Sequence, residues 1–229
     1  MYKLLPILLF AYSLALTTED IYDNSYALVI GIDKYDNTPL DYAVKDAESV
    51  ANLLKENFNF SSKNITTLLN EEATLSNIKN SLSKIASSAI ENDRVLIYFA
   101  GHGVTDILPD GGEMGYLLPI DGKVDNLFAT SIPMDDIKRI SSISKAKHML
   151  FLVDACYGGL SAVGARGLDA TTTPNYIDKI TKDKARQIIT AGGRGEQVVE
   201  KSEWGHSAFT LNLIRALEDG KADLNDDGY

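Results

Sequence analysis

The amino-acid sequence predicts an α/β fold in which a mostly parallel central sheet carries helices on both faces. Two observations lead to this prediction. Short runs of apolar, often β-branched residues recur along the chain, at 26–30, 65–69, 95–99, 149–153 and 188–190. The segments between them repeat apolar residues at helical spacing, at 43–54, 74–90 and 208–217. Strands that are apolar throughout and alternate with amphipathic helices are typical of a parallel sheet buried between two layers of helices.

The composition narrows the classes of function. The chain has 229 residues, which is the length of one domain, and its 22 Lys and Arg against 32 Asp and Glu give a net charge of -10. Because an acidic surface repels phosphate backbones, we expect no nucleic acid as a partner. A single cysteine excludes an internal disulfide framework and a zinc site built from several thiolates.

The N-terminus has the layout of a secretory signal peptide over residues 1–15. Lys3 precedes an apolar run from Leu4 to Leu16, and Ser13-Leu14-Ala15 has the small residues of a cleavage site. A buried N-terminal helix is the alternative. With a signal peptide, the mature protein is expected to be secreted or periplasmic, with no integral membrane association, and its folded domain to span 22–220.

Two of the predicted strands end in residues that can carry out chemistry. The run 95–99 continues into Ala100-Gly101-His102-Gly103, and the run 149–153 continues into Asp154-Ala155-Cys156. Sites in parallel sheets form at the carboxyl ends of the strands, so neighbouring strands would bring His102 and Cys156 together. An imidazole stabilises a nearby thiolate and can protonate an amine leaving group. The alternatives are an inert buried cysteine and a histidine that is only a polar turn residue.

Several segments together resemble the caspase-fold cysteine peptidases, most closely the metacaspases and the bacterial caspase-like proteins. The resemblance runs from Tyr26 to about Gly220, and the 54-residue spacing from His102 to Cys156 agrees with it. The matching segments are YALVIGIDKY, LDYAVKDAESV, VLIYFAGHG, GYLLPIDG, LFLVDACYGG, RQIITAGG and GHSAFTLNLIRAL.

The resemblance implies roles for individual residues. His102 would be the general acid and base, Cys156 the nucleophile, and the backbone N–H groups of Gly103 and Cys156 the oxyanion hole. Asp46 and Asp154 match the family's carboxylates that select Arg or Lys in the primary pocket. For Asp46, a solvated carboxylate in the first turn of a helix is the alternative.

Three further positions concern the pocket and a metal. Ala100 stands where metacaspases usually have a serine, so one pocket hydroxyl is missing. Asp135 and Asp136 match two of the four acidic residues of the metacaspase calcium site, but the positions near Met114 and Val163 are not acidic. No cofactor is therefore expected to be required, and calcium stays only a candidate ligand.

The C-terminal residues 221–229 form an acidic tail. Asp223 to Tyr229 matches the first seven positions of an EF-hand loop, and an Asx-rich turn explains this pattern equally well. The start of a truncated EF-hand-like loop and an Asx-rich turn therefore both stay open as interpretations of the tail. His206, which opens the last predicted helix, is interpreted as a neighbour of the helix cap.

The sequence thus predicts a cysteine endopeptidase that cleaves protein or peptide substrates after Arg or Lys. The loop 160–184, rich in Gly, Ala, Thr and Lys, is a candidate site of self-processing, at Arg166, Lys179, Lys182 or Lys184. A catalytically silent caspase-fold interaction module is the first alternative. A flavodoxin-like nucleotide-binding domain is the second, although the residues after the first strand supply no phosphate-binding glycine loop. No oligomeric state is predicted.

Overall fold

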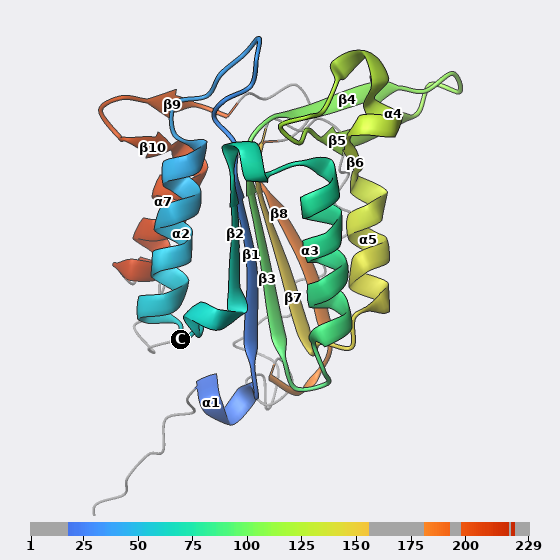
Figure 1. Ribbon diagram of the computed structural model, residues 1–229. Coiled ribbons are helices and arrows are strands. Elements are labelled where there is room, and N and C mark those ends of the chain that lie inside the picture. Colours follow the sequence, from blue (N-terminus) through green and yellow to red (C-terminus); the bar gives the residue numbers. More distant parts are fainter. Residues whose placement is uncertain (1–17, 156–180, 193–197, 220, 223–229) are drawn as a thin grey trace, which may run out of the picture.

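The centre of the molecule is a five-stranded parallel sheet with strand order β2-β1-β3-β7-β8 (Figure 1). The computed structural model describes residues 18–155, 181–192, 198–219 and 221–222. The strands of this sheet are β1 (Ser25–Gly31), β2 (Ile65–Leu69), β3 (Arg94–Ala100), β7 (His148–Asp154) and β8 (Ala185–Thr190). All four strand pairs are parallel, which confirms the predicted fold class.

Helices cover both faces of the sheet. In Figure 1, α2 (Ala43–Asn57) and α7 (Ala208–Glu218) lie on one side, and α3 (Leu75–Ser88) and α5 (Met134–Ile143) lie on the other. Successive residues of a strand point to opposite faces, so each face has its own core. Phe99 packs in the core beneath α3 and α5, whereas Tyr98 packs in the core beneath α2.

The carboxyl ends of the strands share one edge of the sheet, and two small antiparallel sheets lie at that edge (Figure 1). One consists of β4 (Gly103–Ile107), β5 (Glu113–Leu117) and β6 (Ile132–Pro133), and the other of β9 (Glu200–Lys201) and β10 (His206–Ser207). The sequence predicts loops over most of this region. Strands β4 and β9 are only half-buried or exposed, so they lack the continuous apolar run that identifies a buried strand. The remaining short elements are α1 (Thr18–Ile21), η1 (Ser62–Asn64), η2 (Asn70–Glu72), η3 (Val124–Asn126) and α4 (Leu127–Thr130).

A glycine at the end of β1 sets the distance of α2 from the sheet. A Cβ atom at Gly31 would lie 2.5 Å from the carbonyl oxygen of Ala43 and 2.7 Å from the Cβ of Ala47. Only glycine therefore allows the first turn of α2 to pack this closely on β1. The contact brings Asp46, in that first turn, to the carboxyl edge of the sheet.

Several predictions concern residues outside the described parts of the chain. These are the signal peptide at 1–15, Cys156, most of the loop 160–184 and the end of the acidic tail at 223–229.

Among the helices that the structure describes, none combines the length and the apolar character needed to cross a membrane.

Candidate active site

The two strands that lead to His102 and Cys156 are direct neighbours. Strand β3 pairs with β7 in parallel, and Ala100 is the register partner of Asp154. The backbone N–H of Gly101 donates to the carbonyl oxygen of Asp154 at 3.2 Å, which extends the pairing past the end of β3. His102 follows two residues after Ala100, and Cys156 two residues after Asp154. Cys156 itself lies outside the described residues.

The ring of His102 is held by the loop after β1. Its Nε2 lies 2.6 Å from the carbonyl oxygen of Thr38 and 3.0 Å from the hydroxyl of the same residue. Because a carbonyl oxygen only accepts, Nε2 must carry a proton and donate it. In the neutral imidazole, Nδ1 then has the free lone pair and can act as a base.

Tyr35 contacts both the ring and the backbone of His102. The rings of Tyr35 and His102 lie 4.5 Å apart between centroids, and the Tyr35 hydroxyl accepts from the backbone N–H of His102 at 3.1 Å. The same hydroxyl donates to the carbonyl oxygen of Leu118 at 2.8 Å. A Cβ atom at Gly101 would lie 2.6 Å from this hydroxyl, so the first glycine of the GHG sequence is needed for the contact. Burial raises the pKa of Tyr35, so the residue remains a neutral donor.

A cavity of about 150 Å³ opens beside His102. It is lined by Leu40, Ala43, Asp46, Ala100, Gly101, His102, Asp154, Val198, Glu200 and Ser207. Three residues predicted for the primary pocket, Asp46, Asp154 and Ala100, thus line one cavity. The alternative of a solvated Asp46 does not apply, because its side chain is only 1% exposed.

The two aspartates of this cavity are linked through Ser207. The Ser207 backbone N–H donates to Oδ2 of Asp46 at 3.0 Å, and its hydroxyl donates to Oδ2 of Asp154 at 2.5 Å. Oδ1 of Asp46 lies 2.5 Å from Nδ1 of His206. Ser207 also caps helix α7, since its Oγ accepts the N–H of Thr210 at 3.0 Å.

One oxygen of Asp154 has no hydrogen-bond partner among the residues that the structure describes. Oδ2 accepts from the Ser207 hydroxyl and from the Thr210 hydroxyl at 2.6 Å. The Tyr98 hydroxyl lies 3.3 Å from Oδ2 and 2.6 Å from the Thr210 hydroxyl oxygen. Oδ1 is buried and has no hydrogen bond from any described residue, although Asp154 is only 4% exposed. A buried carboxylate oxygen in this state is costly unless a ligand satisfies it.

Burial raises the pKa of both aspartates. For Asp154, the bonds from Ser207 and Thr210 oppose the increase, and the charge of Asp46 adds to it. For Asp46, the bonds from Ser207 and His206 oppose it. Two carboxylates that share a desolvated site favour a cation between or beside them.

Sequence reasoning missed several residues that position the site, namely Tyr35, Thr38, Ser207 and Glu200. Tyr35 closes the YALVIGIDKY segment, but nothing in that segment shows that its hydroxyl reaches the GHG loop. The shorter contact of Thr38 with His102 is made by its backbone carbonyl, which any residue type could supply. His206 does precede the helix cap as predicted, but its contact with Asp46 joins residues 160 positions apart.

Asp135 and Asp136, the two residues that match the metacaspase calcium site, lie on the first turn of α5. The Asp135 carboxylate accepts from Lys138 at 2.9 Å, and Asp136 pairs with Lys79 at 3.5 Å and with Arg139 at 3.9 Å. Within the described parts of the chain, no group of three or more His, Cys, Asp or Glu side chains is arranged to hold a metal ion. The carboxylates present, engaged by basic side chains, do not fit a calcium site.

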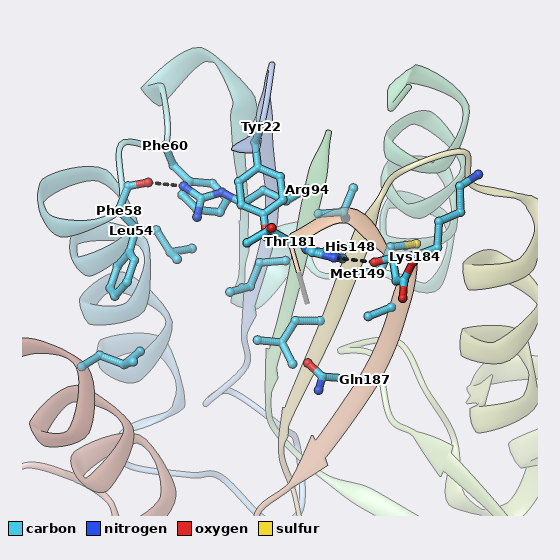
Figure 2. Close-up of a pocket in the computed structure, with 16 residues that line it drawn as sticks. Tyr22, Leu54, Phe58, Phe60, Arg94, His148, Met149, Thr181, Lys184 and Gln187 are labelled. Atoms are coloured by element: carbon cyan, nitrogen blue, oxygen red, sulfur yellow. Dashed lines mark hydrogen bonds between the residues drawn. The ribbon is translucent and has the colours of Figure 1, made fainter. Parts of the chain in front are cut away.

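A larger cavity, of about 620 Å³, lies at the opposite edge of the sheet, beside the amino ends of β3, β7 and β8 (Figure 2). Three of its polar residues are bonded to one another: Tyr22 Oη lies 2.5 Å from Nδ1 of His148, and Nε2 of His148 donates to the carbonyl oxygen of Asp183 at 2.8 Å. The Arg94 guanidinium donates to the carbonyl of Phe58 and stacks over Tyr22. Burial lowers the pKa of His148, which keeps it neutral in this structural network.

Comparisons with known proteins identify the family of this chain. The model of the caspase domain family matches residues 24–227. Metacaspase-7 of Arabidopsis thaliana is 28% identical over 169 residues, which cover 68% of this chain and 40% of that protein. The chain therefore spans well under half the length of this curated relative.

A crystal structure of a protein from Geobacter sulfurreducens shares the fold with a TM-score of 0.62. The two sequences are 19% identical, and the match covers 86% of this chain and 83% of the other. At this identity the likeness concerns the fold alone. The family match spans most of the chain, including both motif-bearing strands, and the chain belongs to the caspase domain family of cysteine peptidases.

Proposed function

We propose that the protein is a cysteine endopeptidase with Cys156 as the nucleophile and His102 as the general acid and base. The observation that supports this most directly is the orientation of His102. Its Nε2 is committed to the Thr38 carbonyl, so Nδ1 is the basic nitrogen. The histidine follows the strand that pairs with the one leading into Cys156.

In the proposed reaction, Nδ1 of His102 takes the thiol proton and the thiolate sulfur attacks the carbonyl carbon of the scissile peptide. The carbonyl electron pair moves to the oxygen, where the backbone N–H groups of Gly103 and Cys156 donate to it. His102 then protonates the leaving amine as the C–N bond breaks, which leaves an acyl thioester. A water molecule, activated by the same imidazole, hydrolyses the thioester and restores the free thiol. No step involves calcium or another cofactor.

The proposed specificity is for Arg or Lys before the scissile bond. The cavity beside His102 contains two buried carboxylates, and the Oδ1 atom of Asp154 lacks a partner among the described residues. A cationic side chain would satisfy this oxygen, whereas an acidic one would add a third negative charge to a desolvated site.

The proposal is tested with fluorogenic peptides that differ only at the residue before the scissile bond. We expect cleavage after Arg and Lys and none after Asp, with the Cys156→Ala protein as the blank. Cleavage after Asp would contradict the specificity while leaving the dyad intact.

The alternative is a catalytically silent interaction module. Alkylation by iodoacetamide distinguishes the two, since a thiol activated by His102 reacts faster at neutral pH than an ordinary one. An ordinary rate in the parent protein, unchanged by His102→Gln, together with no cleavage of any peptide, would favour the silent module.

A further inference from the structure

The hydrogen bonds at the start of β4 depart from the regular pattern of an antiparallel sheet. The register between β4 and β5 joins Gly103 to Leu117, which makes His102 the partner of Leu118. In a hydrogen-bonded antiparallel pair, the two residues exchange both of their N–H···O=C bonds. This pair forms one of them directly, because the N–H of Leu118 donates to the carbonyl oxygen of His102 at 2.9 Å.

The second bond of the pair passes through the side chain of Tyr35. The N–H of His102 donates to the Tyr35 hydroxyl oxygen at 3.1 Å, and the hydroxyl donates to the carbonyl oxygen of Leu118 at 2.8 Å. The hydroxyl is thus inserted between two backbone groups that regular pairing would join directly. A direct bond needs the nitrogen and the oxygen at about 3 Å, so the inserted hydroxyl holds the backbone of His102 farther from β5.

The surroundings of Tyr35 fix its hydroxyl in this position. The residue is only 7% exposed and packs in the core beneath α3 and α5. Gly101 leaves room for the hydroxyl, because a Cβ atom at this position would lie 2.6 Å from the hydroxyl oxygen. A side chain packed in a core has little freedom to move. The inserted hydroxyl is therefore a rigid spacer.

The loop after β1 holds His102 at two points. Tyr35 bonds to its backbone, and Thr38, three residues later, accepts from Nε2 with its carbonyl oxygen at 2.6 Å. Without the hydroxyl, the His102 N–H and the Leu118 carbonyl oxygen would lose their partner, and a direct bond between them would restore one. That bond would draw the backbone of His102 toward β5. Because the imidazole moves with its own Cα atom, the ring would be displaced from Thr38.

We propose that Tyr35 is a positioning residue, whose hydroxyl is inserted in the β4–β5 pairing to set the place of His102 relative to Thr38. This inference rests on the proposed role of His102 as the general acid and base. Tyr35 is not among the described residues that line the cavity beside His102. It therefore acts on the chemical step and not on the binding of the substrate side chain.

The test compares Tyr35→Phe with Tyr116→Phe. Tyr116 is a matched control, because it is 2% exposed, lies on β5 of the same small sheet and contacts the sulfur of Met114 with its hydroxyl. On the Arg peptide, Tyr35→Phe should lower kcat by about 10-fold to 100-fold, the order of loss that a misplacement of about 1 Å causes. KM should stay within about two-fold, since the cavity is intact. Tyr116→Phe should leave kcat and KM within about two-fold.

Urea unfolding of the same three proteins distinguishes positioning from stability. A purely structural role predicts that Tyr35→Phe unfolds in less urea while the folded protein keeps its kcat. A kcat within about two-fold of the parent value would overturn the inference, whatever the change in stability. An equal loss of kcat in Tyr116→Phe would overturn it as well.

A spectroscopic measurement separates this inference from the proposed reaction. Nitrogen chemical shifts of the imidazole, measured by NMR at a pH where the ring is neutral, report which nitrogen carries the proton. The parent should show His102 protonated at Nε2, as the bond to the Thr38 carbonyl requires. Tyr35→Phe should show a mixture of both tautomers, and Tyr116→Phe the spectrum of the parent.

This change of tautomer would support the role of Tyr35 even if the parent protein cleaved no peptide, an outcome that would overturn only the peptidase assignment. If His102 of Tyr35→Phe kept the proton on Nε2 alone, the hydroxyl would not set the place of the ring, and the inference would be wrong.

Discussion

Replacing Asp154 by Asn would separate the energetic cost of a buried carboxylate from its use in binding. The two side chains have the same shape, so the Asn carbonyl oxygen can take the position of Oδ2 and keep the bonds from Ser207 and Thr210. The amide nitrogen then takes the place of Oδ1, the oxygen that no described residue satisfies. We therefore expect the Asp154→Asn protein to fold.

The variant should be more stable than the parent at neutral pH. Burial raises the pKa of Asp154 in the folded protein, so between its ordinary and its folded pKa the folded state binds more protons than the unfolded state. The free energy of unfolding then falls as the pH rises through this window, by about 1.4 kcal/mol for each unit of pKa difference. Asn does not titrate and avoids this loss. The two proteins should have similar stability below pH 4 and diverge as the pH rises, with each 1 kcal/mol raising Tm by about 2–4 °C.

The same substitution should abolish most of the proposed activity. Removing one partner of a buried charge pair typically costs about 2–5 kcal/mol, which corresponds to a loss of roughly 30-fold to 4000-fold in kcat/KM on the Arg peptide. Asp154 is two residues from Cys156, so the thiol itself needs a control. Losing a nearby negative charge favours the thiolate, and the rate of alkylation by iodoacetamide at neutral pH should not fall.

Three measurements test whether Asp154 serves in binding: thermal unfolding from pH 4 to pH 8, peptide kinetics and alkylation. A variant that is less stable than the parent at neutral pH but retains its kcat/KM would show that Asp154 is a structural group, and our reasoning about the cavity would be wrong. A fall in both cleavage and alkylation would instead locate the damage at the thiol.

Three other predictions follow from the structure and the sequence. Ser207→Ala removes the cap of α7 and a donor to Asp154. It should lower the free energy of unfolding, measured in urea, by about 2.5–4 kcal/mol, because a cap contributes about 1 kcal/mol and a bond to a charged group about 1.5–3 kcal/mol. If the protein processes itself in the loop 160–184, purified Cys156→Ala should stay intact on a gel while the parent is cut there; equal cutting of both would point to another protease. If residues 1–15 are a signal peptide, mass spectrometry of the exported protein should find a chain that starts after Ala15, and an intact N-terminus would contradict this.

The sheet and its helices were predictable because their signals are local and strong. The runs 95–99 and 149–153 are apolar on both faces, and the structure extends each by only one residue at either end. The small sheet of β4, β5 and β6 was not predictable in the same way. Its strands are short, and β6 has two residues, so their pairing depends on contacts distant in sequence.

The residues of the candidate site also differ in how far the sequence predicts them. The residues with distinctive chemistry at strand ends, His102 and Asp154, stand out in the sequence because an apolar strand leads directly into each. The residues that orient them do not. Thr38 contacts the histidine from 64 positions away, and Ser207 contacts Asp154 from 53 positions away. Glu200 looks like any surface glutamate until the hairpin places it beside the cavity.

Packing alone does not explain why Oδ1 of Asp154 is buried without a hydrogen-bond partner in the described part of the chain. Ser207 and Thr210 donate to the other oxygen, and the Tyr98 hydroxyl contacts Thr210 at 2.6 Å, so this network stabilises the carboxylate on one side only. An uncharged acceptor could satisfy the same hydroxyls without the cost of burying a charge. A fold that keeps a titratable group with a raised pKa at the carboxyl end of β7 gives up stability there. Such groups concentrate where a ligand of opposite charge binds. The substrate cation is the group that would recover this energy, which is why stability and activity should change in opposite directions when Asp154 becomes Asn.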